Sequence, residues 1–79
     1  MTTIQILNLL ERMDQLIRLR ATGTPSQFAQ KVELSKSMLY IYLDLLRDLG
    51  APIQYSKSEK TYFYAYKVTL HLKYKKNEH

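Results

Sequence analysis

The chain has 79 residues, a net charge of +5 and a pI near 9.6, and it contains no cysteine. A chain of this length is expected to form one small domain. The composition excludes disulfides and cysteine-ligated zinc, and His71 and His79 are too few for a histidine-rich metal site. No apolar run is long enough to span a bilayer and no secretory signal is recognisable, so we expect a cytoplasmic protein without membrane contacts.

The positive charge is concentrated in the C-terminal part of the chain. Residues 51–79 hold six lysines against two glutamates, a net charge of +4, whereas residues 1–50 carry only +1. Such an asymmetry suits a polyanionic partner, and nucleic acid is the first candidate. A solvated lysine-rich tail is the alternative interpretation.

The first two predicted helices follow from apolar periodicity and from capping residues. Residues 3–21 place their apolar side chains on one stripe at the helical period, and Gly23 is expected to end this helix. Thr24, Pro25 and Gln27 then form the capping-box start of a short second helix.

A third helix is expected from Ser35, a good N-cap, to Leu49, with Gly50 as its cap and Pro52 blocking its continuation. Only a few residues separate it from the second helix. Two short helices joined this tightly predict a helix-turn-helix.

After Pro52 the pattern changes from the helical to the strand period. The segment "PIQYS" predicts a short strand, "KSEK" (57–60) a polar tip, and "TYFYAYKVTLHLKY" (61–74) a long alternating strand with a bend or break near Ala65–Lys67. The predicted fold class is therefore α+β: a winged helix-turn-helix with three helices, a β-hairpin wing and a C-terminal strand. Residues 1–74 are expected to form this single domain, followed by a basic flexible tail at 75–79.

The segment "ELSKSMLYIYLDLLRDLGAPIQY" resembles bacterial winged helix-turn-helix regulators of the DeoR and biotin-repressor-like (helix-turn-helix type 11) group. In that group a helix beginning Ser-x-x-Thr-[Ile/Val]-Tyr-x-x-Leu-x-x-Leu precedes a glycine and a Pro-Ile strand. The matching residues are Ser35, Leu39, Tyr40, Leu43, Leu46, Gly50, Pro52 and Ile53. The preceding segment "RLRATGTPSQFAQKV" is similar to the group's second helix through Gly23, Thr24, Pro25, Phe28 and Ala29.

The resemblance covers roughly residues 9–66 and implies a regulator that binds duplex DNA. The group usually has threonine where Met38 stands and often arginine where Ile41 stands. Both departures remove polar or charged contacts from the helix that reads DNA.

Two sets of residues are candidates for DNA contact. The N-terminal residues of a recognition helix approach base edges, which here gives Ser35, Lys36, Ser37, Met38, Tyr40 and Ile41. Phosphates could be bound by the start of the second helix and by the wing tip, which gives Thr24, Ser26, Gln27, Lys57, Ser58 and Lys60. The carboxylates Glu11, Asp14, Asp44 and Asp48 are expected to be plain surface charges.

The favoured function is that of a small bacterial or phage transcriptional regulator, nucleoid-associated, that binds double-stranded DNA as a homodimer. The predicted strand Lys67–Tyr74 is the candidate dimer element, because an unpaired edge invites a second chain. No catalytic constellation, cofactor or small-molecule ligand is indicated, so an enzyme is not expected.

Two other functions stay open. A winged-helix protein-interaction module would use the apolar surface of the third helix, formed by Met38, Tyr40 and Ile41. Single-stranded nucleic acid could stack on the alternate tyrosines 62, 64 and 66, unless these rings pack the hairpin onto the helices.

Overall fold

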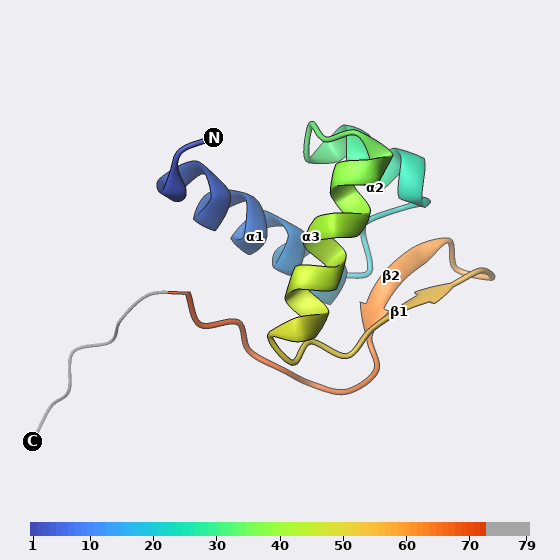
Figure 1. Ribbon diagram of the computed structural model, residues 1–79. Coiled ribbons are helices and arrows are strands. Elements are labelled where there is room, and N and C mark those ends of the chain that lie inside the picture. The colour runs from blue at the N-terminus through green and yellow to red at the C-terminus, as the bar shows by residue number, and fades with distance from the viewer. Residues whose placement is uncertain (73–79) are drawn as a thin grey trace, which may run out of the picture.

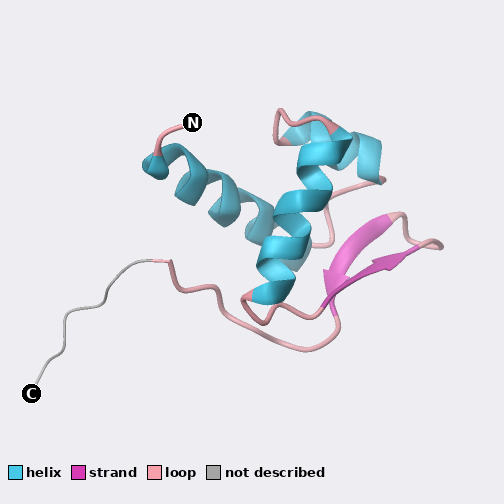
Figure 2. Cartoon of the chain, in the orientation of Figure 1, coloured by secondary structure: helices cyan, strands magenta, loops and turns pink. Residues whose placement is uncertain are grey.

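Residues 1–72 are described in the computed structural model, and they form three helices followed by a two-stranded antiparallel sheet (Figure 1). The helices are α1 (Thr3–Arg18), α2 (Pro25–Lys31) and α3 (Lys36–Asp48), and the strands are β1 (Ile53–Ser56) and β2 (Thr61–Tyr64). Figure 2 shows the hairpin on one side of the helices, at the end of α3. The predicted α+β class is confirmed, with the element order of a winged helix-turn-helix domain.

The start of α2 is fixed by the capping box that the sequence predicts. The Thr24 hydroxyl accepts the Gln27 N–H (3.3 Å), and the Gln27 side chain accepts the Thr24 N–H (2.9 Å). Pro25 occupies the first turn, where its missing N–H costs nothing. Gly23 has φ +73°, and a Cβ at this position would collide with the Gln27 side chain.

Helix α1 ends earlier than predicted. Arg20, and not Gly23, takes the left-handed position after the helix, with φ +53°. The Ala21 N–H then donates to the Leu16 carbonyl (2.9 Å), which closes a Schellman motif. The prediction that Gly23 ends this helix is therefore wrong.

Helix α3 is bounded as predicted, with its caps just outside the helix. The Ser35 hydroxyl accepts the Met38 N–H (3.2 Å), and Gly50 follows the C-cap with φ +105°. The turn before it contains Glu33 at φ +57°, a left-handed conformation that disfavours any residue with a side chain. This tight turn places α2 and α3 as a helix-turn-helix.

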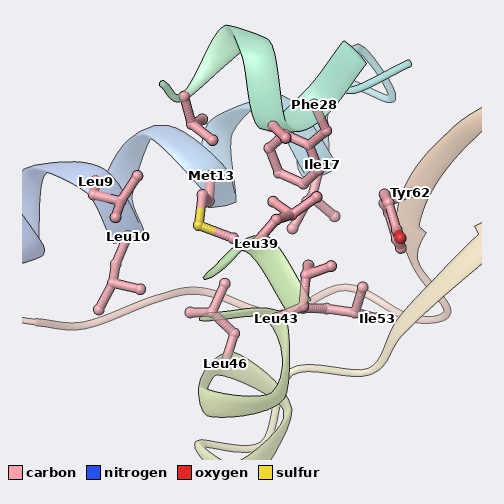
Figure 3. Close-up of a cluster of buried hydrophobic side chains, with 12 residues drawn as sticks. Leu9, Leu10, Met13, Ile17, Phe28, Leu39, Leu43, Leu46, Ile53 and Tyr62 are labelled. Carbon is pink, nitrogen blue, oxygen red and sulfur yellow. The ribbon is translucent and has the colours of Figure 1, made fainter. Parts of the chain in front are cut away.

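The core lies where all three helices and the hairpin meet. Figure 3 shows its side chains converging on one cluster, with Leu39 and Leu43 of α3 among them. The buried apolar residues are Leu9, Leu10, Met13, Ile17, Phe28, Ala29, Val32, Leu39, Leu43, Leu46, Ile53 and Tyr62. Because every element contributes to this cluster, α3 is fixed relative to the rest of the fold by its inner side, and its outer side faces away from the core.

The wing is attached to the helices by a buried pair of hydroxyls. Thr22, in the α1–α2 connection, is fully buried, and its hydroxyl lies 3.0 Å from that of Thr61. The same Thr22 hydroxyl accepts the Tyr62 N–H (2.8 Å). These bonds satisfy buried polar groups and fix the base of the hairpin against the helices.

The chain beyond β2 does not form the predicted C-terminal strand within the described residues. It bends at residues 65–66, as predicted, and residues 67–72 run without strand pairing. Val68, Leu70 and Leu72 alternate with more exposed neighbours, and Leu70 and Leu72 pack against the core cluster. The alternation thus reports an apolar side, but a strand also needs a hydrogen-bonded neighbour, which this segment lacks within residues 1–72. Residues 73–74 of the predicted strand and the predicted tail at 75–79 lie outside the described residues.

Candidate nucleic-acid interface

The N-terminal half of α3 presents an uncovered surface. Lys36 and Ser37 are exposed, and Tyr40 and Ile41 retain 44% and 58% of their accessible surface. Met38 is at the edge of the same surface, 38% exposed. No segment of residues 1–72 covers these side chains, so a groove of DNA could reach the predicted base-reading residues together.

Several of the polar side chains predicted to contact DNA already make hydrogen bonds within the chain. The Ser35 hydroxyl oxygen is the cap acceptor of α3, and Thr24 and Gln27 are bonded to each other. Ser26 is exposed in the first turn of α2. Of the predicted phosphate contacts at this end of α2, Ser26 therefore has the side chain most open to a ligand.

The wing turn, residues 57–60, carries the predicted cations on exposed side chains. Lys57, Ser58 and Lys60 are all exposed, and neither lysine makes a hydrogen bond or ion pair within the described part of the chain. The Ser58 hydroxyl lies 3.2 Å from that of Ser56. Lys60 has φ +54°, which closes the turn before β2. The turn can therefore offer two ammonium groups to a phosphate backbone.

A basic residue that the sequence did not single out links α3 to the wing. The Arg47 Nε donates to the Ile53 carbonyl (3.3 Å), and its Nη1 lies 3.2 Å from the Asp44 carboxylate. Arg47 thus orients the first strand of the wing relative to α3 and partly neutralises Asp44 on the outer side of the helix. The sequence indicates this role of Arg47 only weakly, because a basic residue in the last turn of a helix is common.

The alternate tyrosines do not form one exposed aromatic face. Tyr62 is buried, with its ring 5.7 Å from that of Phe28 and 4.9 Å from that of Tyr55. Only Tyr66 of the proposed stacking set is widely exposed, at 64%. Tyr62 therefore packs the hairpin onto the helices, the alternative to base stacking, and it is not available to stack on bases.

Asp14 is not the surface charge that the sequence suggested. Its side chain is buried, accepts a hydrogen bond from the Tyr64 hydroxyl (2.6 Å) and forms an ion pair with Arg18. The hydrogen bond between Asp14 and Tyr64 connects α1 to β2. A helical wheel does not reveal it, because Tyr64 lies 50 residues away in the sequence.

Burial raises the pKa of two tyrosines in the wing. For Tyr62 desolvation is the largest cause, with a smaller contribution from Tyr40, and Arg47 partly opposes the shift. For Tyr64 desolvation also dominates, and Arg18 opposes it. The folded chain therefore holds both phenols in their neutral form at a pH where the unfolded chain would lose the protons.

We expect the stability to fall as the pH rises above 10.0, the ordinary tyrosine value. A raised pKa means that the native state binds more protons than the unfolded state there, so the free energy of unfolding decreases with pH. Urea unfolding below and above this pH measures the effect. Tyr64→Phe should unfold with a shallower pH dependence, and an identical dependence in the variant would contradict this assignment.

Residues 1–72 contain no cluster of histidine, cysteine and carboxylate side chains suited to holding a metal ion. None of the helices in this part of the chain is long and apolar enough to traverse a bilayer. Comparison with known proteins adds no relative: no family model, no curated protein and no solved structure matches the chain.

Proposed function

We propose that the chain is a DNA-binding protein, a small transcriptional regulator of the cytoplasm and nucleoid. Helix α3 enters the major groove through its N-terminal half, and the wing turn contacts the sugar–phosphate backbone. The observation that carries the proposal is the uncovered N-terminal surface of α3, with Lys36, Ser37 and Tyr40 all exposed.

Charge supports the same proposal. Lys36, Lys57 and Lys60 are exposed cations without a partner in the described residues, and they belong to the two elements that contact DNA in winged-helix proteins. Asp44, the first acidic residue within α3, is paired with Arg47. With about four to six phosphates neutralised, the logarithm of the affinity should fall with the logarithm of salt at a slope of about −4 to −5.

A homodimer is part of the proposal, because one recognition helix reads few bases and two half-sites give useful affinity. The residues that pair the two copies are not assigned, since the predicted element 67–74 forms no strand over residues 67–72. Selection of bound duplexes from a random pool at moderate salt tests both parts. An enriched palindrome is the expected result; recovery of unenriched sequence with no salt dependence would refute the function.

Lys36→Ala is expected to weaken DNA binding and to alter the preferred sequence. Lys36 lies at the first position of α3, where a side chain can reach guanine acceptors or a phosphate. Binding assays on duplexes from the selection measure both effects. Lys31→Ala, at the end of α2, removes the same charge outside the predicted contacts and should leave the sequence preference unchanged. The same preference in Lys36→Ala as in the wild type would rule out α3 as the reading helix.

One observation favours a second candidate, a protein-interaction module. An apolar stripe of Met38, Ile41, Leu45 and Leu49 runs along α3, and Leu49 is 60% exposed. Leu45 and Leu49 are too far along the helix to be base-contacting residues, and exposed apolar patches often mark protein contacts. If this is the function, random duplex DNA at low salt should bind weakly, and Lys36→Ala should change nothing.

A further inference from the structure

The wing turn contains a carboxylate between its two lysines. Glu59 stands between Lys57 and Lys60, and its backbone N–H donates to the Ser56 hydroxyl (3.2 Å), which holds it in the tight turn. Its side chain is 54% exposed. A negative charge at this place would face the same phosphates that the lysines attract, well within a Debye length at physiological salt.

Arg20, two residues after the C-terminal end of α1, forms an ion pair with this carboxylate. Its Nη1 lies 2.7 Å from Glu59 Oε2, across 39 residues of sequence. Its guanidinium also lies over the Phe63 ring of β2, 4.6 Å from the centroid. The planar guanidinium of Arg20 thus contacts an aromatic ring with its face and a carboxylate with its edge. A lysine ammonium has no planar face and could not make both contacts in this way.

Arg20 is held at this position by an unusual backbone conformation. It is the left-handed residue that ends α1, and the α1–α2 connection continues directly into the buried Thr22 that holds the base of the wing. The side chain therefore leaves the helices at a point that is fixed relative to the hairpin. This makes the ion pair with Glu59 a property of the fold rather than of two unconstrained surface side chains.

We propose that Arg20 neutralises Glu59, so that a DNA duplex meets the wing turn as a cationic surface formed by Lys57 and Lys60. Arg20 is a positioning and charge-compensating residue and does not itself contact the phosphate. The inference rests on the proposed DNA-binding function and adds to it a residue from outside both predicted contact sets.

A double-mutant cycle on duplex DNA tests the inference. Arg20→Gln keeps an unbranched polar side chain but removes the charge, and Glu59→Gln removes the charge that Arg20 compensates. Arg12→Gln is the matched control, because it deletes one arginine charge on α1 whose guanidinium bonds only to the Lys31 carbonyl among the described contacts. Thermal unfolding of each variant checks the fold, which an exposed ion pair should change little.

The expected result is that Arg20→Gln loses about two- to fivefold in affinity beyond the loss in Arg12→Gln, the range typical of exposed charge pairs. In the Glu59→Gln background, Arg20→Gln should cost no more than Arg12→Gln does. An equal loss from Arg20→Gln in both backgrounds would show that Arg20 acts on DNA directly and would overturn the inference, as would a loss no larger than that of the control. Both results leave DNA binding by the wild type intact, whereas a wild type that fails to bind duplex DNA refutes the proposed function, and the inference with it.

Discussion

Leu43→Ala is expected to destabilise the domain by roughly 2–5 kcal/mol, the range for a fully buried leucine. Leu43 has no accessible surface and lies in the middle of α3, within the cluster shared by the three helices and the hairpin. A domain of this size is stabilised by only about 5–10 kcal/mol in total. Much of the folded population should therefore be lost on mild heating, as urea and thermal unfolding would show.

The matched control for this substitution lies two residues away. Leu45 is on the same helix but 38% exposed, and Leu45→Ala should cost clearly less, about 1 kcal/mol or below. Since the two variants remove the same atoms, the difference between them measures burial and not helix propensity. Similar losses in both variants would mean that α3 is not packed as described.

Lys57→Ala combined with Lys60→Ala is expected to lower the affinity for every duplex, whatever its sequence, and to make the salt slope shallower by about 1.8. Each lysine is exposed on the wing turn and free of a partner within residues 1–72, so each is able to displace one condensed counterion from DNA. Fluorescence anisotropy titrations at several salt concentrations measure both quantities on specific and random duplexes.

A double variant with the same charge change provides the comparison. Arg12→Ala with Lys31→Ala removes two cations from the α1–α2 side, where Arg12 bonds to the Lys31 carbonyl and Lys31 to the Ala21 carbonyl. We expect this pair to leave the slope nearly unchanged. If both double variants altered the slope equally, binding would depend on net charge alone and the wing would have no particular role.

Most of the helical framework could be predicted because its signals are local. Thr24 with Gln27, Ser35 and Gly50 each act on backbone groups a few residues away, and each has the predicted role in the structure. The prediction places the end of α1 too late, because Arg20 takes the left-handed position after the helix without any local signal that favours it there. The apolar stripe leaves the core after Ile17 and the chain turns at Arg20, whereas Gly23 uses its own positive φ just before the N-cap of α2.

The contacts that attach the wing could not be predicted, because they join residues far apart in sequence. Thr22 meets Thr61, and Tyr64 meets Asp14, only once the hairpin has packed against the helices. Thr22, Thr61 and Asp14 are buried without any local pattern that marks them for burial. The expected strand at 67–74 is the converse case: alternation placed Leu70 and Leu72 on one apolar side of a dimer strand, whereas these side chains pack against the core of the same chain. Alternation carries no information on whether a partner strand exists.

Glu33, the exposed left-handed residue in the turn of the helix-turn-helix, is a position where a substitution could raise the stability of the fold. Glycine would occupy φ +57° without steric cost, so Glu33→Gly offers a gain in stability at a residue outside both predicted contact sets. Substitutions that retarget α3 to new sequences will often weaken so small a domain. Laboratory evolution of its specificity could therefore begin from a Glu33→Gly background, which would widen the range of recognition helices that the domain tolerates.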